Sequence, residues 1–127
     1  MQGKRILMIE DDRCFLEVIQ YFLEMEKYRF IGFTETKDIV PLAQVIKPDL
    51  ILLDYLLPYA NGGTLCCDLR RCPEFEHVPV VLISAYPPEQ LQLDNVPFSA
   101  FIPKPFDLFD LLVCMKKLLR HRVGTAA

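Results

Sequence analysis

Polar residues that can bind a metal ion or a phosphoryl group follow several short apolar runs of the sequence. They are an acidic pair, an aspartate, a serine and a lysine: Glu10 and Asp11, Asp54, Ser84, and Lys104. Three carboxylates brought together repel one another and need a cation, and their oxygens suit a hard divalent ion, Mg²⁺ or Mn²⁺. An ammonium and a hydroxyl beside that ion suit a phosphoryl group, whose oxygens need neutralisation during transfer. These residue types predict phosphoryl chemistry if the fold gathers them.

The apolar runs have the length and composition of buried strands. We expect strands at residues 5–10, 29–35, 49–54, 78–85 and 99–104. The segments between them predict helices at 13–28, 38–47, about 64–71 and from Asp107 onward, the first with an apolar face of Phe15, Val18, Ile19, Phe22 and Leu23. Strands that are apolar along nearly their whole length, alternating with helices, indicate an α/β fold with a doubly wound five-stranded parallel sheet and helices on both faces.

A parallel sheet would bring the polar residues together. Right-handed crossovers make all five strands point the same way, so that their carboxyl ends meet at one edge. Open α/β sheets bind their ligands in the crevice outside that edge. Pro103 lacks a backbone N–H, which places the fifth strand at the border of the sheet.

Composition restricts the remaining function classes. The 127 residues suffice for one domain with one core, and a hydrophobic content of 52% is not gathered into a membrane-spanning run or a signal peptide. We therefore expect a cytoplasmic protein that does not bind membranes. A net charge of −3 argues against direct nucleic-acid binding, and five cysteines without a CxxC pair are expected to be reduced thiols rather than metal ligands.

Four motifs, in this order and at these spacings, resemble the receiver domain of two-component response regulators: IEDD, LILLDYLLPYANG, LISA and PKPF. The resemblance covers essentially the whole chain. It implies a flavodoxin-like sheet with strand order 2-1-3-4-5, a receiver domain at 1–122 and a C-terminal tail at 123–127. It also implies phosphorylation of Asp54 by a histidine kinase or phosphotransfer protein. The chain would then be no enzyme beyond its own phosphorylation and dephosphorylation.

The resemblance also implies a role for each site residue. Glu10 and Asp11, with Asp54 and the backbone carbonyl of Leu56, match the Mg²⁺ site. Ser84 matches the hydroxyl residue that contacts the phosphoryl group and moves in the switch. Further positions match the aromatic switch residue, the lysine of the site, a cis-proline and the loop after the phosphoacceptor: Phe101, Lys104, Pro105, and Pro58 with Gly62.

One segment departs from the family pattern. Residues 86–98 contain three prolines and no glycine where many receivers have a full fourth helix. Proline is tolerated only in the first turn of a helix, so we expect a short or irregular fourth helix, with at most residues 88–93 helical. Together with strand five and the last helix, this segment should form the surface for a downstream effector or a second copy.

Other functions fit less well. A receiver-like interaction module that is not phosphorylated usually lacks one of the site residues, whereas all are present here. An aspartyl-phosphate phosphatase would need a second carboxylate at position 56, where Leu56 stands. A flavodoxin-like FMN binder would need a Ser/Thr/Gly-rich loop after the first strand, where the sequence reads Asp12-Arg13-Cys14.

Overall fold

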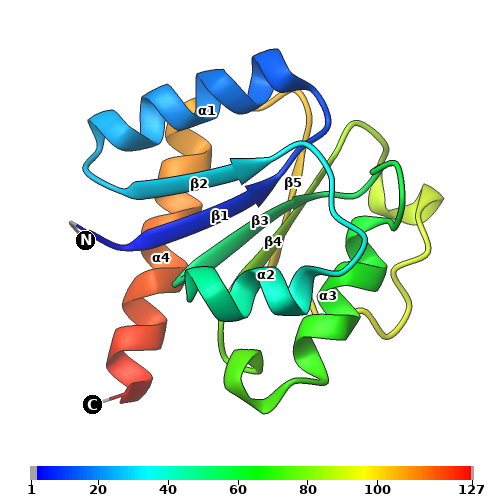
Figure 1. The fold of residues 1–127 in the computed structure, drawn as a ribbon. Coiled ribbons are helices and arrows are strands. Elements are labelled where there is room, and N and C mark those ends of the chain that lie inside the picture. The colour runs from blue at the N-terminus through cyan, green and yellow to red at the C-terminus, as the bar shows by residue number, and fades with distance from the viewer. Residues whose placement is uncertain (1–2, 127) are drawn as a thin grey trace.

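The computed structural model describes residues 3–126, with side chains as far as Arg120. Five parallel strands form one sheet in the order β2-β1-β3-β4-β5, as predicted (Figure 1). The strands are β1 (Arg5–Ile9), β2 (Arg29–Phe33), β3 (Leu50–Asp54), β4 (Val80–Ser84) and β5 (Ala100–Pro103). The proline-ended strand β5 lies at the border of the sheet, where its missing N–H costs no ladder bond.

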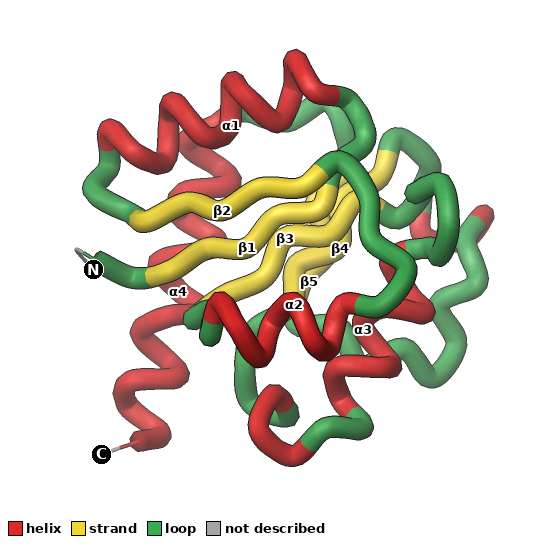
Figure 2. Tube along the Cα trace, viewed as in Figure 1, coloured by secondary structure: helices red, strands yellow, loops and turns green. Residues whose placement is uncertain are grey.

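Helices cover both faces of the sheet, which confirms the doubly wound α/β architecture. They are α1 (Arg13–Met25), α2 (Ile39–Ile46), α3 (Gly62–Arg70) and α4 (Leu108–Ala126), with 3-10 turns η1 (Pro73–Phe75) and η2 (Pro88–Gln90). Helices α1 and α4 pack on one face, and α2 and α3 pack on the other (Figure 2).

Side-chain alternation along the strands builds two cores. Ile6 and Met8 of β1 join the core beneath α1 and α4, whereas Leu7 and Ile9 join the core beneath α2 and α3. All four side chains are fully buried. A strand buried on both faces must be apolar at every position, which explains the uninterrupted apolar runs of the sequence.

Capping side chains set the starts of three helices. Asp12 caps α1 and Asp38 caps α2, each accepting a hydrogen bond from a backbone N–H of the first turn. Helix α3 begins at Gly62, two residues before the predicted Thr64, because Asn61 accepts a bond of 2.8 Å from the Thr64 N–H. The expected start of this helix at residue 64 was therefore two residues too late.

Two further expectations about the helices differ from the structure. On α1, Val18 is 52% exposed and Leu16 is buried in its place, so the buried stripe runs through Leu16, Ile19 and Leu23. Helix α4 extends to Ala126, past the expected end of the domain at residue 122, and Ala127 lies outside the described residues. The division into a domain at 1–122 and a tail at 123–127 stays a prediction.

The segment between β4 and β5 is largely irregular, as predicted from its prolines. Of residues 86–98, only the 3-10 turn Pro88–Gln90 is helical. Within the part of the chain that the structure describes, no helix combines the length and hydropathy that crossing a membrane requires.

Candidate functional site

Three carboxylates gather at the carboxyl edge of the sheet. Glu10 directly follows β1, Asp11 comes next, and Asp54 closes the neighbouring strand β3. One oxygen of each lies within 4.8 Å of the others, with Glu10 and Asp54 buried and Asp11 exposed. The predicted acidic cluster is therefore formed, and it is open to solvent on the side of Asp11.

Lys104 places its ammonium group between the two buried acids. Its Nζ donates to Glu10 Oε1 at 2.9 Å and to Asp54 Oδ2 at 3.2 Å. The remaining carboxylate oxygens accept backbone bonds: Glu10 Oε2 from the N–H of Asp12 at 3.0 Å, and Asp54 Oδ1 from the N–H of Leu56 at 3.3 Å. The backbone thus fixes the orientation of both carboxylates.

The alternation of side chains along the strands explains why Glu10, Asp54 and Lys104 meet. Ile6 and Met8 of β1 face α1 and α4, and Glu10 continues that even-numbered series. Asp54 continues the series of Leu50 and Leu52 in the same way. Lys104 follows Ile102, which also faces this side, so all three functional groups project toward the face that α1 covers.

Burial and mutual repulsion shift the proton affinities of the site. Burial raises the pKa of Glu10 to about 7, and the neighbouring Asp54 carboxylate adds to this, although the hydrogen bond from Lys104 opposes it. Burial alone would lower the pKa of Lys104, but its bonds to Glu10 and its attraction to both carboxylates outweigh that effect and raise the pKa. The lysine therefore stays charged, while one cation does not compensate the three acids.

The donor set fits a hard divalent cation. Oxygen atoms of three carboxylates converge, one of them exposed, and burial raises the pKa of Glu10, an effect that a bound cation would oppose. Mg²⁺ and Mn²⁺ prefer such oxygen ligands and retain some water when bound. Glu10, Asp11 and Asp54 are the residues that would hold this ion.

The other predicted site residues have contacts outside the acidic cluster, except Leu56, which contacts Asp54 through its N–H. Ser84 ends β4 and is 1% exposed, and its Oγ accepts a bond of 3.0 Å from the Tyr86 N–H. Phe101 packs on the α2 and α3 side of the sheet, edge-on to Phe98 with ring centroids 6.4 Å apart.

Leu56 contributes its N–H to Asp54, and the role of its carbonyl oxygen as a metal ligand stays a prediction. The peptide bond between Lys104 and Pro105 is cis, as the resemblance implied.

Phe15 belongs to the site, although its sequence position suggested only core packing. The Lys104 Nζ lies 4.7 Å from the centroid of the Phe15 ring. Phe106 meets the same ring edge-on, with centroids 5.7 Å apart and an interplanar angle of 77°. The only sequence signal was an aromatic residue at the fourth position after the acidic pair, on the apolar face of the helix.

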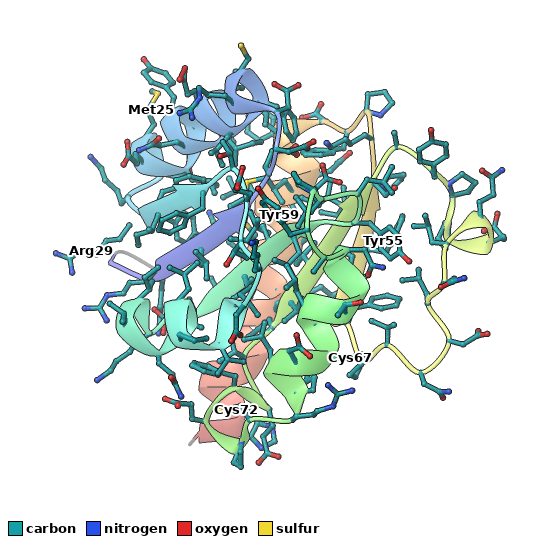
Figure 3. The ribbon with its side chains drawn as sticks, turned by 45° about the vertical axis from the view of Figure 1, so that its right-hand side comes forward. Met25, Arg29, Tyr55, Tyr59, Cys67 and Cys72 are labelled. Atoms are coloured by element: carbon teal, nitrogen blue, oxygen red, sulfur yellow. The ribbon has the colours of Figure 1, made fainter. Side chains whose placement is uncertain are left out.

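Two residues beside Asp54 hold its backbone in place. The Gly62 N–H donates to the Tyr55 carbonyl at 2.8 Å, and a Cβ atom on Gly62 would stand 2.7 Å from the carbonyl oxygen of Asp54. The Tyr55 side chain is 6% exposed, and its hydroxyl accepts a bond of 3.2 Å from the N–H of Gln92. Tyr55, the residue next to Asp54, is therefore linked through its hydroxyl to the irregular segment after β4, on the α3 side of the molecule (Figure 3).

Comparison with known proteins agrees with this geometry. The response regulator receiver domain family matches residues 6–116. YbdJ, an uncharacterized transcriptional regulatory protein of Bacillus subtilis (strain 168), is 32% identical over 126 residues, which cover 98% of this chain and 55% of that protein. The chain spans about half the length of the curated relatives it matches.

Solved structures show the same fold. The signal receiver domain of a histidine kinase from Syntrophus aciditrophicus superposes with a TM-score of 0.85 at 27% identity, covering 94% of this chain and 92% of that one. The receiver domain of sensor histidine kinase PA1611 from Pseudomonas aeruginosa PAO1, whose active-site cleft coordinates a magnesium ion, gives a TM-score of 0.83 at 23% identity over 92% and 98% of the two chains. This chain belongs to the response regulator receiver domain family of two-component signal transduction.

Proposed function

We propose that the chain accepts a phosphoryl group on Asp54 from a phosphohistidine of a histidine kinase or phosphotransfer protein. The observation that carries this proposal is the position of the Lys104 ammonium, 3.2 Å from Asp54 and 2.9 Å from Glu10, inside the acidic cluster. A carboxylate nucleophile beside a fixed cation and a candidate metal site has the groups that phosphoryl transfer needs.

The transfer forms one bond and breaks one. An oxygen of the Asp54 carboxylate bonds to phosphorus while the P–N bond of the phosphohistidine breaks, and the electron pair of that bond stays on the imidazole nitrogen. Lys104 neutralises charge on the phosphoryl oxygens as they approach Asp54. The Leu56 N–H, 3.3 Å from Asp54 Oδ1, orients the carboxylate for attack.

Glu10, Asp11, Asp54 and the carbonyl oxygen of Leu56 would hold Mg²⁺ or Mn²⁺. The bound ion supplies charge neutralisation for the phosphoryl oxygens and relieves the repulsion among the acids. Without that positive charge, an anionic phosphodonor meets an acidic site with one lysine, so we expect phosphorylation to depend on the metal.

Ser84 and Phe101 would transmit the phosphorylation of Asp54 to the surface of the protein. The Ser84 Oγ accepts the Tyr86 N–H at 3.0 Å, and its O–H can still donate to a phosphoryl oxygen, so a movement of Ser84 toward that oxygen would take Tyr86 with it. The movement of Ser84 pulls the segment after β4 toward the site. Phe101 on the adjacent strand β5 then turns into the space that this segment leaves. A shift from about 1:99 to 99:1 between two conformations needs roughly 5.5 kcal/mol, which a few charge-assisted bonds to phosphate can supply.

The partner surface would lie on β5, α4 and residues 86–98. Phe109 and Val113 of α4 are 67% and 63% exposed. Val113 also lines a depression of about 540 Å³ between β5 and α4, together with residues that include Ala100 and Leu118. We propose that a downstream effector domain or protein, or a second copy, binds here, with no direct contact to nucleic acid or membrane.

The decisive experiment compares the wild type with Asp54→Asn. We expect acetyl phosphate to add one phosphoryl group to the wild type in the presence of Mg²⁺ or Mn²⁺, and none after chelation. Intact-mass spectrometry measures both. Equal uptake by Asp54→Asn would overturn the assignment of the phosphoacceptor.

The same measurement separates the alternatives. An unphosphorylated interaction module would take up no phosphate under any condition. A phosphatase would turn over added phosphomonoesters, whereas the proposed protein acts only on its own Asp54. The cytoplasmic location expected from the sequence stays a prediction.

A further inference from the structure

The ammonium of Lys104 has three chemically different neighbours. Two of its hydrogen-bond donors are directed at Glu10 and Asp54. The face of the Phe15 ring, 4.7 Å from Nζ, occupies another side. The lysine side chain is 24% exposed, so this ring provides part of what separates the ammonium from water.

A residue of the loop that carries Lys104 also contacts the Phe15 ring and fixes its position. Phe106, two residues after Lys104, meets the Phe15 ring edge-on at 5.7 Å. Phe15 therefore contacts both ends of the short stretch Lys104–Phe106, and α1 fixes that stretch relative to the acidic cluster. Edge-to-face pairs of this kind have a defined geometry, which restricts rotation of the ring.

We propose that Phe15 is a positioning residue that holds the Lys104 ammonium at Asp54 through the face of its ring, an inference that rests on the proposed function. A ring face attracts a cation without demanding a fixed hydrogen-bond direction. The ammonium can therefore exchange a carboxylate oxygen for a phosphoryl oxygen and still keep its contact with Phe15. A carboxylate or a water at the same place would compete for the donors of the lysine.

A purely structural role predicts different behaviour. If Phe15 only filled space between α1 and the loop, a residue of similar size would serve equally well whatever its electrostatics. If the ring positions the cation, the electron density of the ring face must matter. Fluorine substitution changes that density with little change in size, so a series of fluorinated phenylalanines at position 15 separates the two roles.

The experiment measures the rate constant of phosphorylation by acetyl phosphate at saturating Mg²⁺, with phenylalanine and its mono-, di- and trifluorinated forms at position 15. We expect a stepwise decrease, reaching about three- to tenfold for the trifluorinated ring and for Phe15→Leu. Phe15→Tyr should keep nearly the wild-type rate constant. Mg²⁺ affinity, measured by calorimetry, should change less than about twofold, because the Phe15 ring offers no ligand atom to the ion.

Phe22 supplies the matched control. It lies two turns along α1 and meets Phe109 edge-on at 6.2 Å, and among the described residues no cation lies over its ring. The same fluorinated series at Phe22 should leave the phosphorylation rate constant unchanged. The upfield ring-current shift of the Lys104 side-chain protons provides a direct readout in the unphosphorylated protein, and Phe15→Leu should abolish it.

The outcomes distinguish this inference from the proposed function. If the wild type is phosphorylated but the rate constant does not change along the fluorinated series at position 15, the role of Phe15 is overturned. The same holds if the series at position 22 lowers the rate constant as much as the series at position 15. Either result leaves Asp54 as the acceptor. A wild type that is not phosphorylated at all would overturn the proposed function, and the positioning role with it.

Discussion

Glu10, which follows β1, and Lys104, which follows β5, form a partly buried ion pair, with Oε1 and Nζ 2.9 Å apart and the glutamate fully shielded from solvent. The lysine also serves Asp54, so one cation is shared by two buried carboxylates. Since the desolvation of buried charges often exceeds the attraction between them, this arrangement does not favour stability in the absence of a metal.

Stability of the metal-free protein should therefore depend on pH. The pKa of Glu10 is raised from 4.5 to about 7, so the folded state binds this proton more tightly than the unfolded state does. The stabilising contribution is fully present below about pH 4.5 and is lost as the pH rises through about 7. We expect the free energy of unfolding in EDTA to fall by about 1 kcal/mol or more between pH 5.5 and 8.

Glu10→Gln is the control for this prediction. It removes the titrating group and keeps one amide oxygen, which can accept from the Asp12 N–H or from the lysine but not from both. Most of the pH dependence in this range should therefore disappear. Urea denaturation at several pH values measures it. An unchanged slope in Glu10→Gln would assign the pH dependence to another group.

Asp11 tests the metal site separately. It is the exposed member of the cluster, and removing its charge relieves repulsion without leaving a buried donor unpaired. Asp11→Asn should match or exceed the wild type in stability without metal, by up to about 1 kcal/mol, and lose the stabilisation that Mg²⁺ gives the wild type. Thermal melts with and without Mg²⁺ measure both effects. A variant that Mg²⁺ still stabilises fully would exclude Asp11 as a ligand.

Gly62 should not tolerate a side chain. Its added Cβ would meet backbone atoms, the Asp54 carbonyl oxygen at 2.7 Å and the Tyr55 Cα at 3.1 Å, neither of which can rotate away. We expect Gly62→Ala to cost roughly 2 kcal/mol of stability and to slow phosphorylation, because Asp54 must shift.

The neighbouring glycine gives a matched comparison. At Gly63 the nearest atoms to an added Cβ belong to side chains, Asn61 Oδ1 at 3.1 Å and the Tyr55 ring at 3.3 Å. Gly63→Ala should therefore cost less than Gly62→Ala. Urea denaturation of both variants and their phosphorylation time courses decide the point, and equal losses would show that the clash at Gly62 relaxes.

The strands and the acidic cluster were predictable because they depend on local patterns. Apolar runs locate each strand, and the carboxyl ends of parallel strands must share an edge, which places Asp54 beside Glu10. The expected strands run past the observed ones by one or two residues at one end or at both. At the carboxyl ends of β1 and β2, polar residues such as Glu10 and Glu35 follow the ladder without extending it. The start of α3 was misplaced because Asn61, a strong cap, precedes two glycines that resemble a turn.

The contacts of Phe15 and Tyr55 were not predictable from the sequence. Phe15 has the spacing of a core residue, and its ring meets Lys104 only because α1 crosses the loop after β5. Tyr55 continues the buried run of β3, whereas its hydroxyl pairs with Gln92, 37 residues away. Both contacts depend on how separate elements pack, which periodicity along one element does not specify.

Two tyrosine hydroxyls should respond oppositely to removal. The Tyr28 Oη is buried and, among the described residues, has no hydrogen-bond partner, whereas the Tyr55 Oη accepts the Gln92 N–H. Tyr28→Phe should raise the free energy of unfolding by about 1 kcal/mol, because a buried unpaired hydroxyl is removed. Tyr55→Phe should lower it by a similar amount, and urea denaturation of both variants measures the difference in sign.

The irregular segment 86–98 should exchange its amide protons fastest outside the chain ends. Its backbone hydrogen bonds are local turns, such as Gln90 N to the Pro87 carbonyl at 3.0 Å, and the bonds that anchor it to the strands come from the side chains of Ser84 and Tyr55. Local bonds of this kind open without global unfolding. Binding of beryllofluoride with Mg²⁺ should protect the amides of the segment from exchange.

Tyr55→Phe provides the sharpest test of that anchoring. Loss of the hydroxyl should speed exchange at Gln92 by about fivefold, corresponding to roughly 1 kcal/mol, while amides of β1 and β3 keep their rates. Hydrogen exchange followed by NMR resolves the individual amides. An unchanged rate at Gln92 would show that the Tyr55 bond does not limit opening. If beryllofluoride does not change the amide exchange rates of residues 86–98, this segment takes no part in the switch. Asp54 would remain the proposed phosphoacceptor.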